Sequence, residues 1–145
     1  MQIRSLTKDD YDRIVSVVDH WWGGPAGERP HPVFYYELGE HALVAERDGE
    51  LAGFLLGFVA PTRLPLGYVH LVGIHPDHRR QGVGRALYER FGARCQAAGA
   101  RGIKAISFVG DESAARFHEA LGFEVRVEED YAGPGRARLV FRREL

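Results

Sequence analysis

The sequence has 145 residues, of which 45% are hydrophobic and 27% charged, and its net charge is -1. We expect one domain over residues 1–145, because this length buries a core without disulfides or metals, and the balanced charge argues against nucleic-acid binding. A single cysteine, no export pattern and no apolar stretch long enough to cross a membrane predict a cytoplasmic protein.

The first 40 residues predict a short strand followed by two helices. Gln2 to Leu6 alternates weakly, as a strand does, and Thr7 can cap a helix that runs to about Trp22. Apolar residues recur along that helix at helical spacing and predict a stripe facing the core: Tyr11, Ile14, Val15, Val18 and Trp22. A loop rich in glycine and proline then precedes a second, short helix at 33–39.

The middle of the chain predicts three strands. Residues 41–47 and 50–60 read as the first two, and the Asp48-Gly49 pair between them suits a two-residue hairpin turn. The third strand covers residues 67–75. Its alternation predicts one face with Tyr68, His70, Val72 and Ile74, and an opposite face with Val69, Leu71 and Gly73.

The rest of the chain predicts two helices and three strands. We expect a helix at 82–98, a buried strand at 103–109, a helix from the cap Asp111 to Leu121, and strands at 123–130 and 137–142. The full order is β-α-α-β-β-β-α-β-α-β-β. This order indicates an α/β fold with a mixed sheet.

A glycine-containing motif lies between the strand at 67–75 and the helix at 82–98, and it reads Arg79-Arg80-Gln81-Gly82-Val83-Gly84. Unpaired backbone N–H groups and the helix dipole attract anions at a helix start, and glycines let the backbone approach a ligand closely. The motif therefore predicts a pyrophosphate site. From the residues alone, a tight turn with solvated arginines is the alternative.

This motif resembles the signature of the GCN5-related N-acetyltransferase (GNAT) superfamily, which is Arg or Gln, two residues, Gly, one residue, and Gly or Ala. A second family element is similar to the later segment that contains Asp111, Ala114, Phe117, His118 and Gly122-Phe123. The order of elements also resembles that of the family over essentially the whole chain. Two spaced motifs in the right order carry more weight than either one alone.

The resemblance implies an N-acetyltransferase with acetyl-CoA as acyl donor. It also implies that the strands at 67–75 and 103–109 splay apart to admit the pantetheine arm. A backbone N–H near Leu71 or Val72 would then polarise the thioester carbonyl. The implied donor-binding residues are Leu71, Val72, Ile74, Arg79, Arg80, Gln81, Gly82, Val83, Gly84, Arg85 and Phe117.

Two histidines are the candidate catalytic residues. His70 lies where related enzymes resemble one another in carrying a Glu or His base, and an imidazole suits that task near neutral pH. His118 replaces the family's usual Tyr acid, which puts the acid step in doubt. The plainer alternatives are a packed strand histidine for His70 and a helix-surface histidine for His118. Asp111 is interpreted as a helix cap rather than a cofactor ligand.

The acceptor is harder to read from sequence. The expected reaction is direct attack by a primary amine in a ternary complex, most simply on a small molecule. A protein N-terminus or lysine is one alternative acceptor, and a non-catalytic acyl-CoA sensor is an alternative function. The candidate acceptor-binding residues are Trp21, Tyr36, Glu37 and Tyr68. We expect no metal, and exposed strands near the C-terminus can pair in a homodimer.

Overall fold

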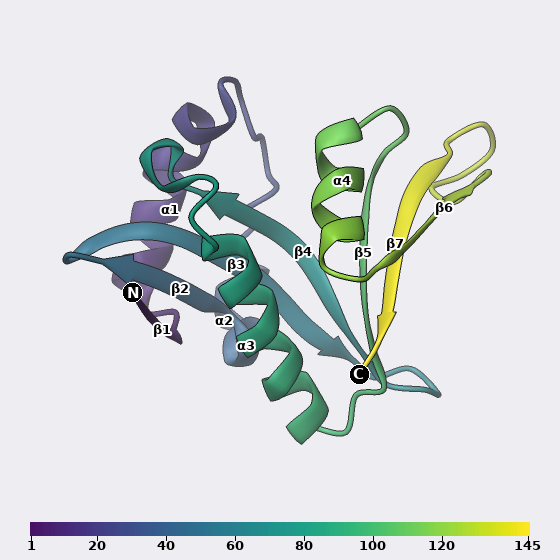
Figure 1. Ribbon diagram of the computed structural model, residues 1–145, viewed down its shortest axis with the longest axis horizontal. Helices are drawn as coiled ribbons and strands as arrows, with labels where there is room; N and C mark the ends of the chain where they lie inside the picture. The colour runs from purple at the N-terminus through teal and green to yellow at the C-terminus, as the bar shows by residue number, and fades with distance from the viewer.

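One seven-stranded sheet runs through the computed structural model, which describes residues 1–145 (Figure 1). Its order is β1-β2-β3-β4-β5-β7-β6, and only β4 and β5 pair in parallel. The strands are β1 (Gln2–Ser5), β2 (Leu43–Arg47), β3 (Glu50–Ala60), β4 (Leu66–Ile74), β5 (Gly102–Phe108), β6 (Glu124–Glu128) and β7 (Arg138–Glu144). The helices are α1 (Lys8–Trp22), α2 (Val33–Tyr36), α3 (Val83–Ala97) and α4 (Glu112–Ala120), with 3-10 turns at Gly39–His41 and Pro76–His78. None of the helices is both long and apolar enough to span a bilayer.

The predicted fold class and order of elements are confirmed. Local signals explain why the elements begin and end where they do. Thr7 and Asp10 form a reciprocal capping box at the start of α1, and Gly23 ends that helix in the left-handed conformation. Asp48 and Gly49 both have positive φ, 54° and 77°, as the predicted hairpin turn requires.

The boundaries around the second helix differ most from the prediction, and other elements shift by one or two residues. The second helix ends at Tyr36 instead of Gly39, because the Leu38 N–H bonds back to the Val33 carbonyl and closes the helix. Gly39–His41 then forms a 3-10 turn, so that β2 begins at Leu43 and not at His41.

Helices cover both faces of the sheet (Figure 1). One face carries α1 and α2, which pack against β4 and β3, and the other carries α3 over β2–β4 and α4 over β6 and β7. The buried stripe of α1 differs from the predicted one at three positions. Trp21 is 4% exposed and packs in the core, whereas Trp22 is half-buried and Val15 is 48% exposed. Ile14, Val18 and Trp21 follow one another at steps of four and three residues, which keeps them on one face of the helix. Trp21 therefore completes the stripe and Trp22 lies at its edge.

The two central strands separate along their length. β4 pairs with β5 only through Gly67–Val69 and Ile103–Ala105, near the start of both strands. Beyond Val69 the edge of β4 that faces β5 has no strand partner, although its other edge still pairs with β3. The predicted splay of the central strands is therefore confirmed.

Candidate active site

The start of α3 presents a group of unsatisfied backbone donors. Gly82 caps the helix with φ 80°, and no side chain caps it. The backbone N–H groups of residues 81–85 donate to no acceptor within the protein. Because these donors lie at the positive end of a 15-residue helix, the position attracts an anion.

The arginine side chains around this helix start have no acidic partner. Arg79 donates to the Trp21 carbonyl, and Arg85 Nη2 lies 3.2 Å from the Ala120 carbonyl oxygen. Gln81 accepts from Arg47. Arg80, which is exposed, has φ 63°, and none of the arginines at 79, 80 and 85 forms an ion pair.

Gly84 brings α3 and α4 into close contact. A Cβ atom placed on Gly84 would lie 2.8 Å from the Phe117 ring, so only a glycine leaves room for that ring. Ile74, at the end of β4, lies beside the same point. The start of α3 therefore lies next to Ile74 and Phe117, two residues at the gap between β4 and β5.

A β-bulge at His70 changes the faces of β4. Leu56 pairs with Leu71 and Gly57 with Val69, so His70 has no partner on β3. After the bulge, Leu71 packs in the core under α1, while Val72 and Ile74 pack against the core under α3. His70 instead stacks on Phe34 of α2, with ring centroids 3.8 Å apart.

The prediction of one continuous alternation along β4 is therefore wrong. Val72 and Ile74 do not share a face with Tyr68 and His70, and Leu71 does not share one with Val69. The extra residue shifts the period of two by one position, which moves every later side chain to the opposite face.

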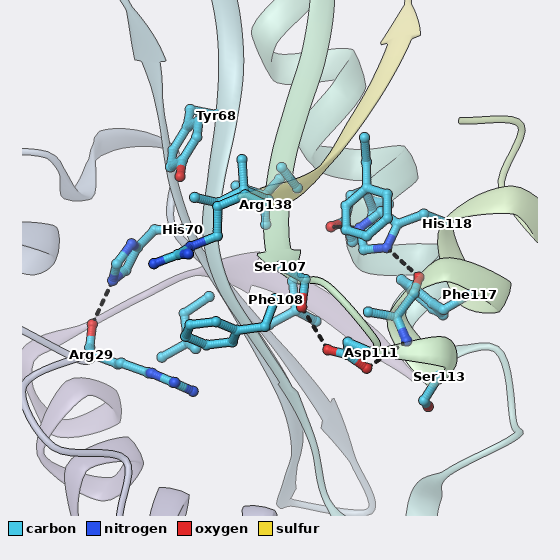
Figure 2. Close-up of a pocket in the computed structure, with 18 of the residues that line it drawn as sticks. Arg29, Tyr68, His70, Ser107, Phe108, Asp111, Ser113, Phe117, His118 and Arg138 are labelled. Atoms are coloured by element: carbon cyan, nitrogen blue, oxygen red, sulfur yellow. Dashed lines mark hydrogen bonds between the residues drawn. The ribbon is translucent and has the colours of Figure 1, made fainter. Parts of the chain in front are cut away.

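A pocket of about 730 Å³ occupies the gap where β4 and β5 separate, and Figure 2 shows most of its lining. Seven of the sequence-predicted residues line it: Tyr68, His70, Leu71, Val72, Ile74, Phe117 and His118. Trp21, Tyr36, Glu37 and the predicted donor-binding residues at 79–85 do not. Trp21 is buried against Phe54, Tyr36 is 60% exposed, and Glu37 is exposed beside it.

His70 is held as a neutral imidazole. Its Nε2 lies 2.7 Å from the Arg29 carbonyl oxygen, which only accepts hydrogen bonds, so Nε2 carries the proton. Nδ1 is then left with the free lone pair. Burial lowers the pKa of His70 below its usual value, which keeps the ring uncharged near neutral pH.

His118 is buried rather than a helix-surface residue, being 8% exposed. Its Nδ1 donates to the Ala114 carbonyl oxygen at 2.8 Å, and its Nε2 accepts from the Tyr88 hydroxyl at 2.7 Å. The ring stacks on Phe141 at 3.9 Å, and burial lowers the pKa of His118. The neutral ring therefore has no N–H left to donate into the pocket.

Several lining residues were not found by sequence reasoning: Trp22, Tyr88, Ser107, Phe108, Ser113 and Arg138, together with Arg29. Ser107 and Phe108 fall in the buried strand predicted at 103–109, but nothing local showed that they line a pocket. Arg29 and Arg138 come from the α1–α2 loop and the start of β7. They reach one pocket only because β7 pairs with β5, which no local motif reveals.

The geometry defines an elongated site with anion-binding donors near one end and a neutral imidazole farther along the same split. Over residues 9–123 the chain matches the Acetyltransferase (GNAT) family, and it belongs to that family. An acetyltransferase of Yersinia pestis (strain Pestoides F) is 24% identical over 131 residues, covering 87% of this chain and 89% of that protein.

Two solved structures share the fold. The ribosomal-protein-S18-alanine N-acetyltransferase of Escherichia coli has a TM-score of 0.75 at 20% identity, covering 99% of this chain and 92% of that one. An aminoglycoside 6'-N-acetyltransferase complexed with coenzyme A has a TM-score of 0.76 at 14% identity, covering 99% of this chain and 97% of that one. One of these proteins is named for a protein acceptor and the other for a small molecule, so the shared fold leaves the acceptor open.

Proposed function

We propose that residues 1–145 form an acetyl-CoA-dependent N-acetyltransferase that acetylates a primary amine, most simply on a small molecule, by direct attack in a ternary complex. Membership of the family supports acetyl transfer. The observation that carries the proposal is the separation of β4 from β5 beyond Val69. The unsatisfied N–H donors at the start of α3 lie near one end of this gap, and the neutral His70 lies farther along it.

The residues at the start of α3 fit the donor. The free N–H groups of residues 81–85 would hold its pyrophosphate, with Arg80 adding charge. The unpaired edge of β4, at Val72 and Ile74, would bond to its amide-containing arm. When bound, acetyl-CoA supplies a thioester: the amine nitrogen bonds to its carbonyl carbon, the carbon–sulfur bond breaks, and an amide and free CoA thiol result.

His70 is the proposed general base. An alkylamine with a pKa of about 10.4 is protonated near pH 7, so a proton must be removed before attack. Nδ1 of His70 is free to accept that proton, while the bond from Nε2 to the Arg29 carbonyl holds the ring in one tautomer.

We propose that His118 holds Tyr88 and the α4 backbone in position and does not donate a proton to the departing sulfur. Its neutral ring gives its N–H to Ala114 and accepts from Tyr88, so it has no proton ready for the departing sulfur. A thiol with a pKa of about 8.5 leaves passably as thiolate, so the reaction loses little without a dedicated acid.

The loop between α1 and α2 supports a small acceptor over a protein one. Arg29 bonds through its carbonyl to His70 and lies over the rings of Trp22 and Phe108, so the loop crosses the pocket instead of leaving an open groove. A cytoplasmic location, and a homodimer formed through exposed strand edges, remain proposals that follow from sequence alone.

Thermal unfolding with acetyl-CoA, followed by CoA thiol release across amines, amino acids and peptides, tests the proposal. We expect stabilisation by acetyl-CoA and thiol release that depends on an amine. Release only with peptides would move the acceptor to a protein terminus or lysine. Stabilisation without release from any amine would make the chain a non-catalytic sensor.

A further inference from the structure

Two arginines line the acceptor side of the pocket without an acidic partner. Arg29 and Arg138 place their guanidinium carbons 5.5 Å and 4.8 Å from the centroid of the same Phe108 ring, which Figure 2 shows between them. Neither arginine forms an ion pair. Arg138 donates only to the Ala137 carbonyl, and the Arg29 side chain makes no hydrogen bond.

The carboxylates nearby form no ion pair with these two arginines. Asp111 is the one acidic residue that lines the pocket, and its two oxygens accept from the Ala114 N–H at 3.1 Å and the Ser107 hydroxyl at 2.6 Å. Glu128 is the partner of Arg138 in the β6–β7 register but forms no ion pair with it. The charged lining of the pocket is therefore two arginines against one aspartate, an excess of one positive charge, and the Asp111 oxygens are already engaged within the protein.

We propose that the acceptor carries an oxyanion, a carboxylate or a phosphate, which Arg29 and Arg138 bind while its amine faces His70. This inference rests on the proposed function and names its substrate class. Guanidinium groups bind such oxyanions in two-point geometry, and cation–π contacts to the Phe108 ring orient both arginines beforehand. A polyamine brings extra positive charge into this pocket and is a poor acceptor.

Matched acceptors test the inference. Amino acids are compared with their carboxamides, and O-phosphoethanolamine with ethanolamine, by kcat/KM from thiol release. We expect the anionic member of at least one pair to be favoured by about 10- to 100-fold, the range of a charge-assisted hydrogen bond. The two pairs separate carboxylate from phosphate. Equal kcat/KM within both pairs, or preference for the uncharged members, would overturn the inference.

Variants tie the preference to the arginine. Arg138→Gln leaves only Arg29 to bind the oxyanion, so it should lower the ratio within the favoured pair by about 10-fold. Arg142→Gln is the matched control, because Arg142 is exposed on the same strand, outside the pocket, and its removal should leave the ratio unchanged. A ratio that survives Arg138→Gln, or that falls equally in both variants, would contradict the assignment.

A binding readout separates this inference from the proposed function. The melting temperature of the CoA-saturated protein is measured with each acetylated product. The products are N-acetyl amino acids and their amides, and N-acetylated phosphoethanolamine and ethanolamine. Stabilisation by anionic products alone, weakened in Arg138→Gln, supports the inference even if no thiol is released, in which case the proposed function fails. Thiol release without any anion-dependent stabilisation keeps the function and overturns the inference.

Discussion

The two parts of the proposed site are built in different ways. At the donor end, a run of consecutive residues at the start of α3 presents backbone N–H groups, and the side chains there mainly fasten the loop to its surroundings. At the acceptor end, side chains of Arg29, His70, Phe108 and Arg138 meet from four separate segments. A backbone site is insensitive to most substitutions, whereas a site made of side chains changes its ligand with each one.

The largest effect is expected at the acceptor end. His70→Asn removes the proposed base and should lower kcat by about 10²- to 10⁴-fold, while acetyl-CoA still raises the melting temperature. Steady-state thiol release measures the loss. A reduction of less than threefold would contradict the role of His70 and return it to a packed strand residue.

The pH profile sharpens this prediction. Burial lowers the pKa of His70, so wild-type kcat/KM should rise with pH through an inflection below about 6.5 and then stay level until the amine titrates. His70→Asn should lack that inflection and keep rising toward the pKa of the amine. Identical profiles for the two proteins would mean that the base lies elsewhere.

The two neighbouring tryptophans should separate stability from acceptor binding. Trp21→Ala should lower the free energy of unfolding by about 3–5 kcal/mol, because it empties a core position that stacks on Phe54. Trp22→Ala should cost less stability and raise the acceptor KM, since Trp22 lines the pocket. Chemical denaturation and steady-state kinetics of both variants provide the test, and a reversed pattern would refute the placement of the α1 stripe.

At the donor end, alanine substitutions at two glycines should act through different causes. Gly84→Ala forces a Cβ against the Phe117 ring and should cost about 1–3 kcal/mol of stability and weaken acetyl-CoA binding. Gly82→Ala meets no atom within 4 Å but must adopt φ 80°, which costs about 1–2 kcal/mol. Calorimetric titration with acetyl-CoA compares them. An unchanged affinity of Gly84→Ala for acetyl-CoA would mean that Phe117 is not part of the donor site.

The smallest catalytic effect is expected at His118. His118→Gln should lower kcat by less than the 10² expected of an essential acid, but it disturbs a buried hydroxyl and should cost about 1–3 kcal/mol of stability. Burial lowers the pKa of folded His118, so below about pH 6.5 the unfolded chain binds the proton more readily and wild-type stability falls. Above that pH the contribution is fully present. The stability difference from His118→Gln, measured by denaturation, should therefore shrink as pH drops.

The donor end was largely predictable from sequence, because caps, glycines and strand–helix alternation are local signals. The hairpin at Asp48-Gly49 and the helix start at Gly82 both appear where predicted. At the acceptor end only His70 and Tyr68 were named in advance, and the rest was not predictable, for two physical reasons. The bulge at His70 breaks the alternation without leaving a mark in composition, and the insertion of β7 between β5 and β6 brings Arg138 to the pocket from far along the chain.

The central claim is that backbone N–H groups at the start of α3 hold the donor's pyrophosphate. Backbone amide NMR of the ¹⁵N-labelled protein during titration with CoA tests it most directly. The account predicts that the largest amide shifts fall on residues 81–85, with further shifts on the unpaired edge of β4 at Val72 and Ile74. Saturable binding that leaves the amides of residues 81–85 unmoved, or no binding at all, would contradict it.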